Sequence, residues 1–194
     1  MTNDSSKPER RELILHAAEQ LFQHYGFAKT TVSDIARAAE VGVGTVYLEF
    51  ASKEAIASEL SLRRYRCVLD AMRQAASGEG SYAERLTAVF QAGLERLSRY
   101  TGEGPHGKEL IVGACTATDR AHADFRAQEE EFLTEFLRVA TAAGEFDVSQ
   151  PRLAARVLLR CYRSYAGCNS EHERMREELE AAHALVLHGL IRRT

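Results

Sequence analysis

Side chains that donate hydrogen bonds or carry charge are closely spaced between Thr30 and Lys53. Thr45 and Tyr47 offer two hydroxyl groups, and Lys53 offers an ammonium group that can neutralise a phosphate. Gly44 precedes them and, having no side chain, lets the main chain approach a phosphate or another helix closely. No nucleophile is paired with a base in the chain, so these residues indicate binding rather than catalysis.

Two short helices are predicted to position these groups. Thr31 followed by Asp34 is a capping-box pattern, which predicts a helix start. The apolar period of this helix ends in a tight turn at Val41 and Gly42. A second helix is predicted from Val43 to Phe50, with its valine and phenylalanine at 46 and 50 inward and its threonine and tyrosine outside. Two such helices joined by a turn containing glycine form a helix-turn-helix, which places its second helix in the major groove of DNA.

This stretch and its flanks resemble the DNA-binding domain of the TetR family of transcriptional regulators. The matching residues are Gly26-Phe27, Thr30-Thr31-Val32, Ile35-Ala36, Ala39, Val41, Gly44-Thr45-Val46-Tyr47, Phe50 and Ser52-Lys53-Glu54-Ala55. The resemblance implies an all-α fold with two domains. We expect an N-terminal three-helix, helix-turn-helix domain over residues 1–53 and a larger helical effector-binding and dimerisation domain over residues 54–194.

We expect the first domain to contact DNA. In the family, the counterparts of Thr45 and Tyr47 contact DNA backbone or bases. The expected DNA-binding residues are Thr31, Arg37, Val43, Gly44, Thr45, Tyr47 and Lys53. Residues 1–66 contain nine Lys or Arg and nine Asp or Glu, so a basic face must come from their arrangement. We expect Lys7, Arg10, Arg11, Lys29, Arg37 and Lys53 to lie near the duplex.

Glu49 departs from the family pattern, because a carboxylate in the second helix repels phosphates. It is compatible with DNA if it accepts a hydrogen bond from a cytosine amino group, or if it pairs with Arg37 or an arm residue. The operator sequence therefore does not carry over from the family.

Apolar residues at helical spacing predict the remaining helices. In the first one, the inward set is Leu13, Ile14, Ala17, Ala18, Leu21, Phe22 and Tyr25. The predicted ranges are 9–25, 52–76, 81–100, 108–117, 120–143, 151–168 and 171–193. No apolar run approaches the ~20 residues of a membrane span, and the polar start MTNDSSKPERRE does not resemble a signal peptide. We therefore expect a cytoplasmic protein that does not bind membranes.

The resemblance implies a homodimer and an effector pocket in the second domain. The last two helices look like the family's dimerisation element, which forms a four-helix bundle with the same pair of a second chain. Their candidate contact residues are Leu153, Val157, Cys161, Leu179, Leu185, Val186 and Leu190. The candidate pocket residues are Phe90, Leu94, Leu97, Cys115, Phe125, Phe132, Phe136, Tyr162 and Tyr165. Many aromatic residues and few buried charges suggest a small hydrophobic effector, which releases a repressor from a palindromic operator.

Other chemistries have weaker support. The spacing of Gly102, Gly104 and Gly107 is GxGxxG, but it follows a helix rather than a strand and so does not predict a dinucleotide site. The histidines at 106, 122, 183 and 188 lack metal-ligand spacing, and we expect no metal or cofactor. The four cysteines, Cys67, Cys115, Cys161 and Cys168, are interpreted as core residues.

Two alternative functions remain open. One is a regulator that senses oxidants through a cysteine thiol; Cys161 and Cys168 are two helical turns apart, ~10 Å, so either would need a partner thiol elsewhere. The other is a helical adaptor that binds proteins, an alternative that the zero net charge of residues 1–66 favours. An enzyme is not expected.

Overall fold

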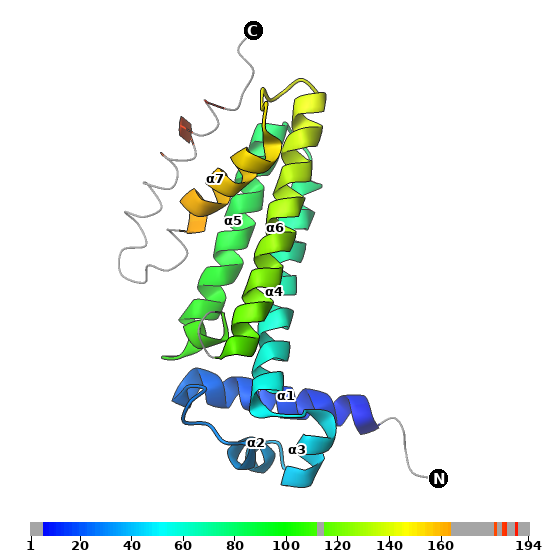
Figure 1. The fold of residues 1–194 in the computed structure, drawn as a ribbon, viewed down its shortest axis with the longest axis vertical. Helices are drawn as coiled ribbons and strands as arrows, with labels where there is room; N and C mark the ends of the chain where they lie inside the picture. The colour runs from blue at the N-terminus through cyan, green and yellow to red at the C-terminus, as the bar shows by residue number, and fades with distance from the viewer. Residues whose placement is uncertain (1–5, 112–114, 164–180, 182–183, 186–188, 190–194) are drawn as a thin grey trace. The chain divides into compact units, whose positions relative to one another are not determined.

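The computed structural model describes residues 6–111, 115–163, 181, 184, 185 and 189. Every regular element in this part of the chain is helical, which confirms the all-α prediction (Figure 1). The elements are α1 (Ser6–Tyr25), α2 (Val32–Ala38), α3 (Val43–Glu49), α4 (Lys53–Ala76), α5 (Tyr82–Gly102), the 3-10 turn η1 (Gly107–Leu110), α6 (Thr116–Ala142) and α7 (Pro151–Arg163).

The predicted helices over 9–25, 108–117 and 120–143 differ from the structure, and the last two predicted helices are described only in part. The first helix begins at Ser6 rather than at residue 9. The helix expected over 108–117 is only the single 3-10 turn η1, and α6 already begins at Thr116. The predicted helix 151–168 is described as α7 up to Arg163, and the predicted helix 171–193 lies outside the described residues apart from four isolated positions.

Two residues of the predicted inward set of α1 are exposed. Leu13 and Tyr25 have 53% and 52% of their surface accessible, whereas Leu15, which was not in the set, is buried. The helical period gives the spacing of an apolar stripe but does not say which neighbours cover its edges. The prediction was therefore wrong at both edges and right for the centre of the stripe, where Ile14, Ala18 and Phe22 are fully buried.

The chain forms two compact units that do not follow chain order. The first unit contains residues 1–65 and 100–124, and the second contains residues 66–99 and 125–194. The core of the first unit is built from α1 to α4, with Phe22, Ile35, Val46 and Ile56 among its buried side chains, and Leu110 of η1 belongs to the same cluster. The functional boundary expected after residue 53 stays a prediction.

The second unit packs its parts of α5 and α6 alongside one another, with α7 crossing them (Figure 1). The rings of Phe90 on α5 and Tyr162 on α7 are stacked, with centroids 3.6 Å apart. Arg152 of α7 donates to Glu130 of α6 at 2.7 Å. Among the described residues, no helix combines the length and the apolar character that crossing a bilayer requires.

Candidate nucleic-acid interface

The start of α2 is fixed by the predicted capping box. The Thr31 hydroxyl oxygen accepts from the Asp34 N–H at 3.2 Å, and the Asp34 carboxylate accepts from the Thr31 N–H at 3.1 Å. Hydrogen bonds from the Thr31 side chain and main chain, aided by the charge of Arg37, hold the pKa of Asp34 below its usual value. Arg37 donates to Asp34 at 2.5 Å from an otherwise exposed position.

The turn between α2 and α3 contains a residue in the left-handed conformation that sequence reasoning missed. Glu40 has φ of 56°, the only positive φ of a non-glycine among the described residues. Its N–H donates to the Arg37 carbonyl, and the Val41 N–H donates to the Ala36 carbonyl at 2.9 Å. These two bonds form a Schellman motif, whose left-handed position is usually glycine. Gly42 instead is the N-cap of α3, with φ of −70°.

One side of α3 is buried and the other is open to solvent. Val46 is 1% exposed and Phe50, just after the helix, is also buried, as predicted. Tyr47 and Leu48 are 54% and 85% exposed. A Cβ atom added to Gly44 would meet nothing within 4 Å. The exposed face of α3, formed by Val43, Gly44, Tyr47 and Leu48, is thus available to a large partner.

Among the six cations expected near DNA, Lys53, Arg11 and Arg37 have partners inside the first unit. The Lys53 ammonium donates to the main-chain oxygens of Phe27 and Thr30. Arg11 donates to the main-chain oxygen of Glu49 and lies over the Phe50 ring. Arg10, Lys29 and Arg37 are exposed, and the Lys7 side chain lies outside the described residues.

The Glu49 side chain makes none of the ion pairs found in the described part of the chain. Arg37, one of its two expected protein partners, pairs with Asp34 instead. Contact of Thr31, Thr45 and the other expected residues with DNA stays a prediction, and so does a contact between Glu49 and cytosine.

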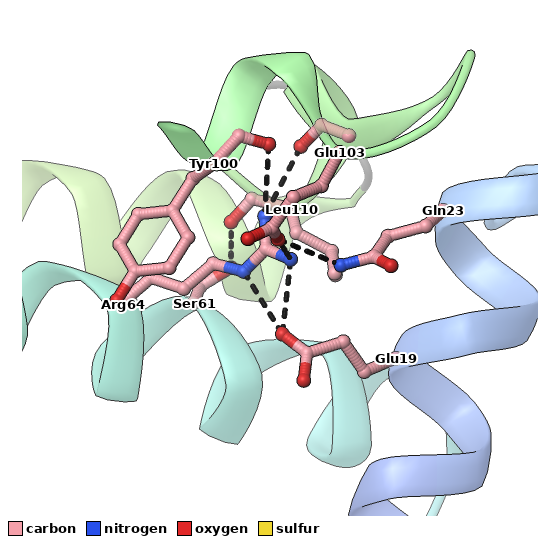
Figure 2. A network of polar contacts seen from close by, with 8 residues as sticks. Glu19, Gln23, Ser61, Arg64, Tyr100, Glu103 and Leu110 are labelled. Carbon is pink, nitrogen blue, oxygen red and sulfur yellow. Dashed lines mark hydrogen bonds and ion pairs between the residues drawn. The ribbon is translucent and has the colours of Figure 1, made fainter. Parts of the chain in front are cut away.

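A buried arginine that sequence reasoning missed holds the first unit together (Figure 2). Arg64 of α4 is 2% exposed. Its guanidinium donates to Glu19 of α1 at 2.9 Å and to Glu103, just after α5, at 3.0 Å. It also donates to the carbonyl of Gly107 at 3.3 Å, and Gln23 of α1 donates to the same Glu103. Because an unpaired buried charge is costly, these partners must stay in place around Arg64.

A second set of bonds attaches residues 103–111 to the helices of the first unit. The Phe27 N–H donates to the Glu109 carboxylate at 2.8 Å, and the other oxygen of Glu109 lies 2.7 Å from His106 Nδ1. The Ser61 hydroxyl donates to the Leu110 carbonyl at 2.6 Å (Figure 2). The Tyr65 hydroxyl donates to the Ile111 carbonyl.

Two glycines of the GxGxxG sequence, Gly104 and Gly107, have a packing role here. A Cβ at Gly104 would lie 2.7 Å from the main-chain oxygen of Gln23, and one at Gly107 would lie 2.6 Å from the main-chain oxygen of Tyr100. Gly104 also has φ of 77°, which side chains disfavour. Close main-chain packing thus accounts for Gly104 and Gly107, whereas a Cβ at Gly102 would meet nothing within 4 Å.

Four expected pocket residues come together in the second unit. Phe90, Leu94, Leu97 and Tyr162 line a cavity of about 20 Å³, together with Met72, Gly93, Leu159 and the buried carboxylate of Glu129. Phe125, Phe132 and Phe136 belong to the same unit but do not line this cavity. Cys115 instead packs against the core of the first unit, and Tyr165 lies outside the described residues.

The expected dimerisation residues of α7 are exposed. Leu153, Val157 and Cys161 are all accessible, and so is Leu185. Leu153, Val157 and Leu185 line one open groove together with Val148 and Leu158. Leu179, Val186 and Leu190 lie outside the described residues.

The cysteines are less buried than predicted. Cys67 and Cys161 are exposed, so their interpretation as core residues was wrong, and Cys115 is half-buried. An α-helical period does not distinguish a small apolar residue in the core from one at the edge of a helix face. None of these three forms a disulfide within the described part of the chain, and Cys168 lies outside the described residues. No group of three potential metal ligands occurs in the described part of the chain.

A capped helix-turn-helix with an exposed second helix, in a chain whose described regular elements are all helical, is typical of a class of DNA-binding regulators. The family model for bacterial regulatory proteins of the tetR family matches residues 14–60. The HTH-type transcriptional repressor KstR2 of Mycolicibacterium smegmatis is 31% identical over 156 residues, covering 73% of this chain and 70% of KstR2. The chain belongs to the TetR family and is a DNA-binding transcriptional regulator.

Two further comparisons agree with this assignment. The HTH-type transcriptional repressor NemR of Escherichia coli K12 is 31% identical over 99 residues, which cover 50% of this chain and 50% of NemR. The match thus spans about half the length of NemR. The solved structure of the fatty acid degradation regulator FadR from Bacillus halodurans has a TM-score of 0.71 at 20% identity, with 100% of both chains covered. This similarity shows the shared fold.

Proposed function

We propose that the protein is a homodimeric repressor that binds a palindromic operator and releases it when a small hydrophobic effector enters the second unit. It acts in the cytoplasm, where its DNA target lies. The observation that carries the proposal is the exposed face of α3, in which Gly44 leaves open space for the approach of a duplex.

The DNA side of the proposal is supported by the way α3 is held. The capping box of α2 and the Schellman motif after it fix the turn, and Val46 and Phe50 anchor α3 to the core. A rigidly held helix can present Tyr47 and Thr45 to a groove without losing much conformational entropy on binding. Lys29 and Arg37 add positive charge from exposed positions.

Dimerisation is supported by the exposed apolar side chains of α7. Leu153 and Val157 are one helical turn apart, and both line the groove that also includes Leu185. Apolar side chains exposed in this way are stabilised when a second copy covers them. A dimer presents two copies of α3 to half-sites about 34 Å apart or more, which is how helix-turn-helix proteins read palindromes.

The effector class is supported by the lining of the cavity in the second unit. Its volume of about 20 Å³ has room for no more than a water molecule, so an effector has to displace side chains of the lining, which include the stacked rings of Phe90 and Tyr162. The lining is otherwise aliphatic apart from the buried carboxylate of Glu129. Among the described residues, the lining has no cationic side chain that could bind an anion, and an anionic ligand would lie beside the Glu129 carboxylate. We therefore propose a neutral or cationic apolar effector.

Octanol, octylamine and octanoate test this preference because they share a chain length and differ in charge. The first two are expected to raise the melting temperature of the protein more than octanoate does. A larger shift with octanoate would contradict the proposed effector class.

The Gly44→Ala substitution tests the DNA face separately from folding. The added methyl group has open space in the protein and favours the helix, so the melting temperature is expected to stay the same or rise. In a complex, the methyl group would lie between α3 and the duplex, and affinity is expected to fall at least tenfold. The measurement is fluorescence anisotropy of a labelled duplex from the region flanking the gene, at several salt concentrations.

Gly102→Ala is the matched control, because a Cβ there also meets nothing within 4 Å and Gly102 lies at the end of α5. This variant is expected to bind DNA like the unchanged protein. Equal affinity of Gly44→Ala and the unchanged protein would show that α3 does not lie against DNA as proposed. Absence of binding to any flanking fragment at low salt would contradict an operator there.

A further inference from the structure

The exposed face of α3 carries an unusually accessible leucine. Leu48 is 85% exposed, the largest exposed fraction among the large apolar side chains of the described residues. It follows Val46 by two residues, about 200° around the helix, so it points away from the core that Val46 anchors. Val43 and Tyr47, at 40% and 54% exposed, are the other large apolar side chains of α3 that are open to solvent.

This face lacks the side chains that read purines. Arginine or lysine recognises guanine, and asparagine or glutamine recognises adenine, through paired hydrogen bonds in the major groove. None of these four residue types occurs in α3, whose sequence is VGTVYLE. The helix therefore offers hydroxyls, one half-buried carboxylate at Glu49 and apolar surface. The apolar group that base pairs present in the major groove is the thymine C5-methyl.

We propose that Leu48 is a specificity-determining residue that reads thymine methyl groups in each half-site of the operator. The inference rests on the proposed function, in which α3 enters the major groove. It predicts a thymine opposite Leu48, with Val43 or Tyr47 beside the next base pair. Recognition then depends on covering methyl groups rather than on hydrogen bonds to guanine.

Contact with phosphates does not explain this leucine, because an isobutyl side chain offers no donor and would remove water from a charged oxygen. Contact with another protein chain would cover the same surface, but it would not depend on a methyl group of the DNA. The two possibilities therefore differ in one measurable quantity, the ratio of the affinities for DNA with and without thymine methyl groups.

Deoxyuridine isolates that quantity, since it pairs as thymine does and lacks only the C5-methyl group. The full-length protein first selects a duplex from a random-sequence library. That duplex is then made with thymine and with deoxyuridine at single positions and at symmetric pairs of positions. Loss of one covered methyl group is expected to weaken binding about fourfold, and loss of a symmetric pair roughly fifteenfold. Leu48→Ala is expected to bind both forms equally at the position that Leu48 reads.

Leu13→Ala is the matched control, since Leu13 is an exposed leucine of α1, and it is expected to keep the full preference for thymine. Two results would overturn the inference. One is that the unchanged protein binds thymine and deoxyuridine duplexes equally. The other is that Leu48→Ala keeps the ratio of the two affinities, whether or not both become weaker, as it would if Leu48 contacted a protein. If no duplex is selected at all, the proposed function itself fails, and this outcome is distinct from the other two.

Discussion

The ammonium nitrogen of Lys53 lies 2.7 Å from the main-chain oxygen of Phe27 and 4.2 Å from the centre of its ring. The same nitrogen donates a hydrogen bond to the main-chain oxygen of Thr30 at 2.8 Å. Lys53 thus ties the first turn of α4 to the segment that joins α1 and α2. A residue expected to neutralise a phosphate thus already contacts two main-chain oxygens and one ring within the protein, and its substitution should lower stability as well as affect any DNA contact.

Lys53→Met keeps most of the stem and removes the ammonium group. Charge-assisted hydrogen bonds to carbonyls contribute about 1.5–3 kcal/mol, and we expect the free energy of unfolding to fall by about 2 kcal/mol. Urea denaturation measures this loss. Lys29→Met, at an exposed position, is the control and is expected to unfold like the original chain. Equal midpoints for the two variants would show that the bonds of Lys53 contribute little.

Glu40→Gly is expected to stabilise the protein. The left-handed φ of 56° is unfavourable for a residue with a Cβ, and glycine removes this strain, which stabilises the fold by up to about 1 kcal/mol. Part of this gain is offset because glycine has more conformational entropy in the unfolded chain. Glu40→Ala is the matched variant, because it keeps the Cβ and removes the charge. Both variants are expected to bind DNA more tightly, because both remove the negative charge of Glu40. Only the glycine variant is expected to raise the melting temperature. A lower melting temperature for Glu40→Gly would contradict this reading of the turn.

The capping carboxylate of Asp34 makes part of the stability depend on pH. Its pKa is lower in the folded protein, chiefly because the Thr31 side chain donates to it, so the carboxylate form favours folding. This contribution is complete above the ordinary pKa of 3.8 and is lost as pH falls further, through the folded value. Asp34→Asn is therefore expected to be less stable than the original chain at pH 7, with the difference shrinking below pH 3.8.

Urea midpoints at several pH values test this expectation. Asp147→Asn, at an exposed position of the second unit, controls for the general effect of losing one carboxylate. A difference between Asp34→Asn and the original chain that stays constant down to acidic pH would mean that the cap does not depend on charge.

Arg63 and Arg64 are neighbours in sequence whose substitution should have very different effects. The Arg64 side chain is 3% exposed, whereas Arg63 is 37% exposed and pairs with the exposed Glu12. Arg64→Met leaves buried carbonyls and two carboxylates without their donor, and we expect a loss of about 3 kcal/mol. Arg63→Met is expected to cost below about 1 kcal/mol, as for other surface ion pairs. Similar losses for the two, in urea denaturation, would refute the structural importance of the Arg64 network.

Val157→Arg tests the proposed dimer. Val157 is 51% exposed on α7, near Arg156 and Arg160, so a further cation there should prevent two copies from meeting without disturbing the fold of one chain. Light scattering after size-exclusion chromatography is expected to show a monomer. Val139→Arg, at a 38% exposed position of α6, is the control and should leave the mass unchanged. A dimeric Val157→Arg variant would place the interface elsewhere.

The parts of the site that sequence predicted are those held by local contacts. Thr31 and Asp34 are three residues apart, so the pattern that predicts the cap already contains both partners. The burial of Val46 follows equally from the period of one helix. Arg64 could not be assigned in this way, because Glu19 and Glu103 are 45 and 39 residues away from it. An arginine within a helical pattern is usually exposed, and only the packed structure shows which one is buried.

The involvement of residues 100–124 in the first unit matters for anyone who builds hybrid regulators. A DNA-binding segment that ended at residue 65 would lack Glu103, the Gly107 carbonyl and Leu110. Apolar core side chains that pack against Leu110 would then be exposed, and the buried Arg64 guanidinium would lose two of its partners. Exchanging operator specificity between two proteins of this design therefore requires transplanting two separate pieces of chain, or grafting only the outward residues of α3 onto an otherwise intact host.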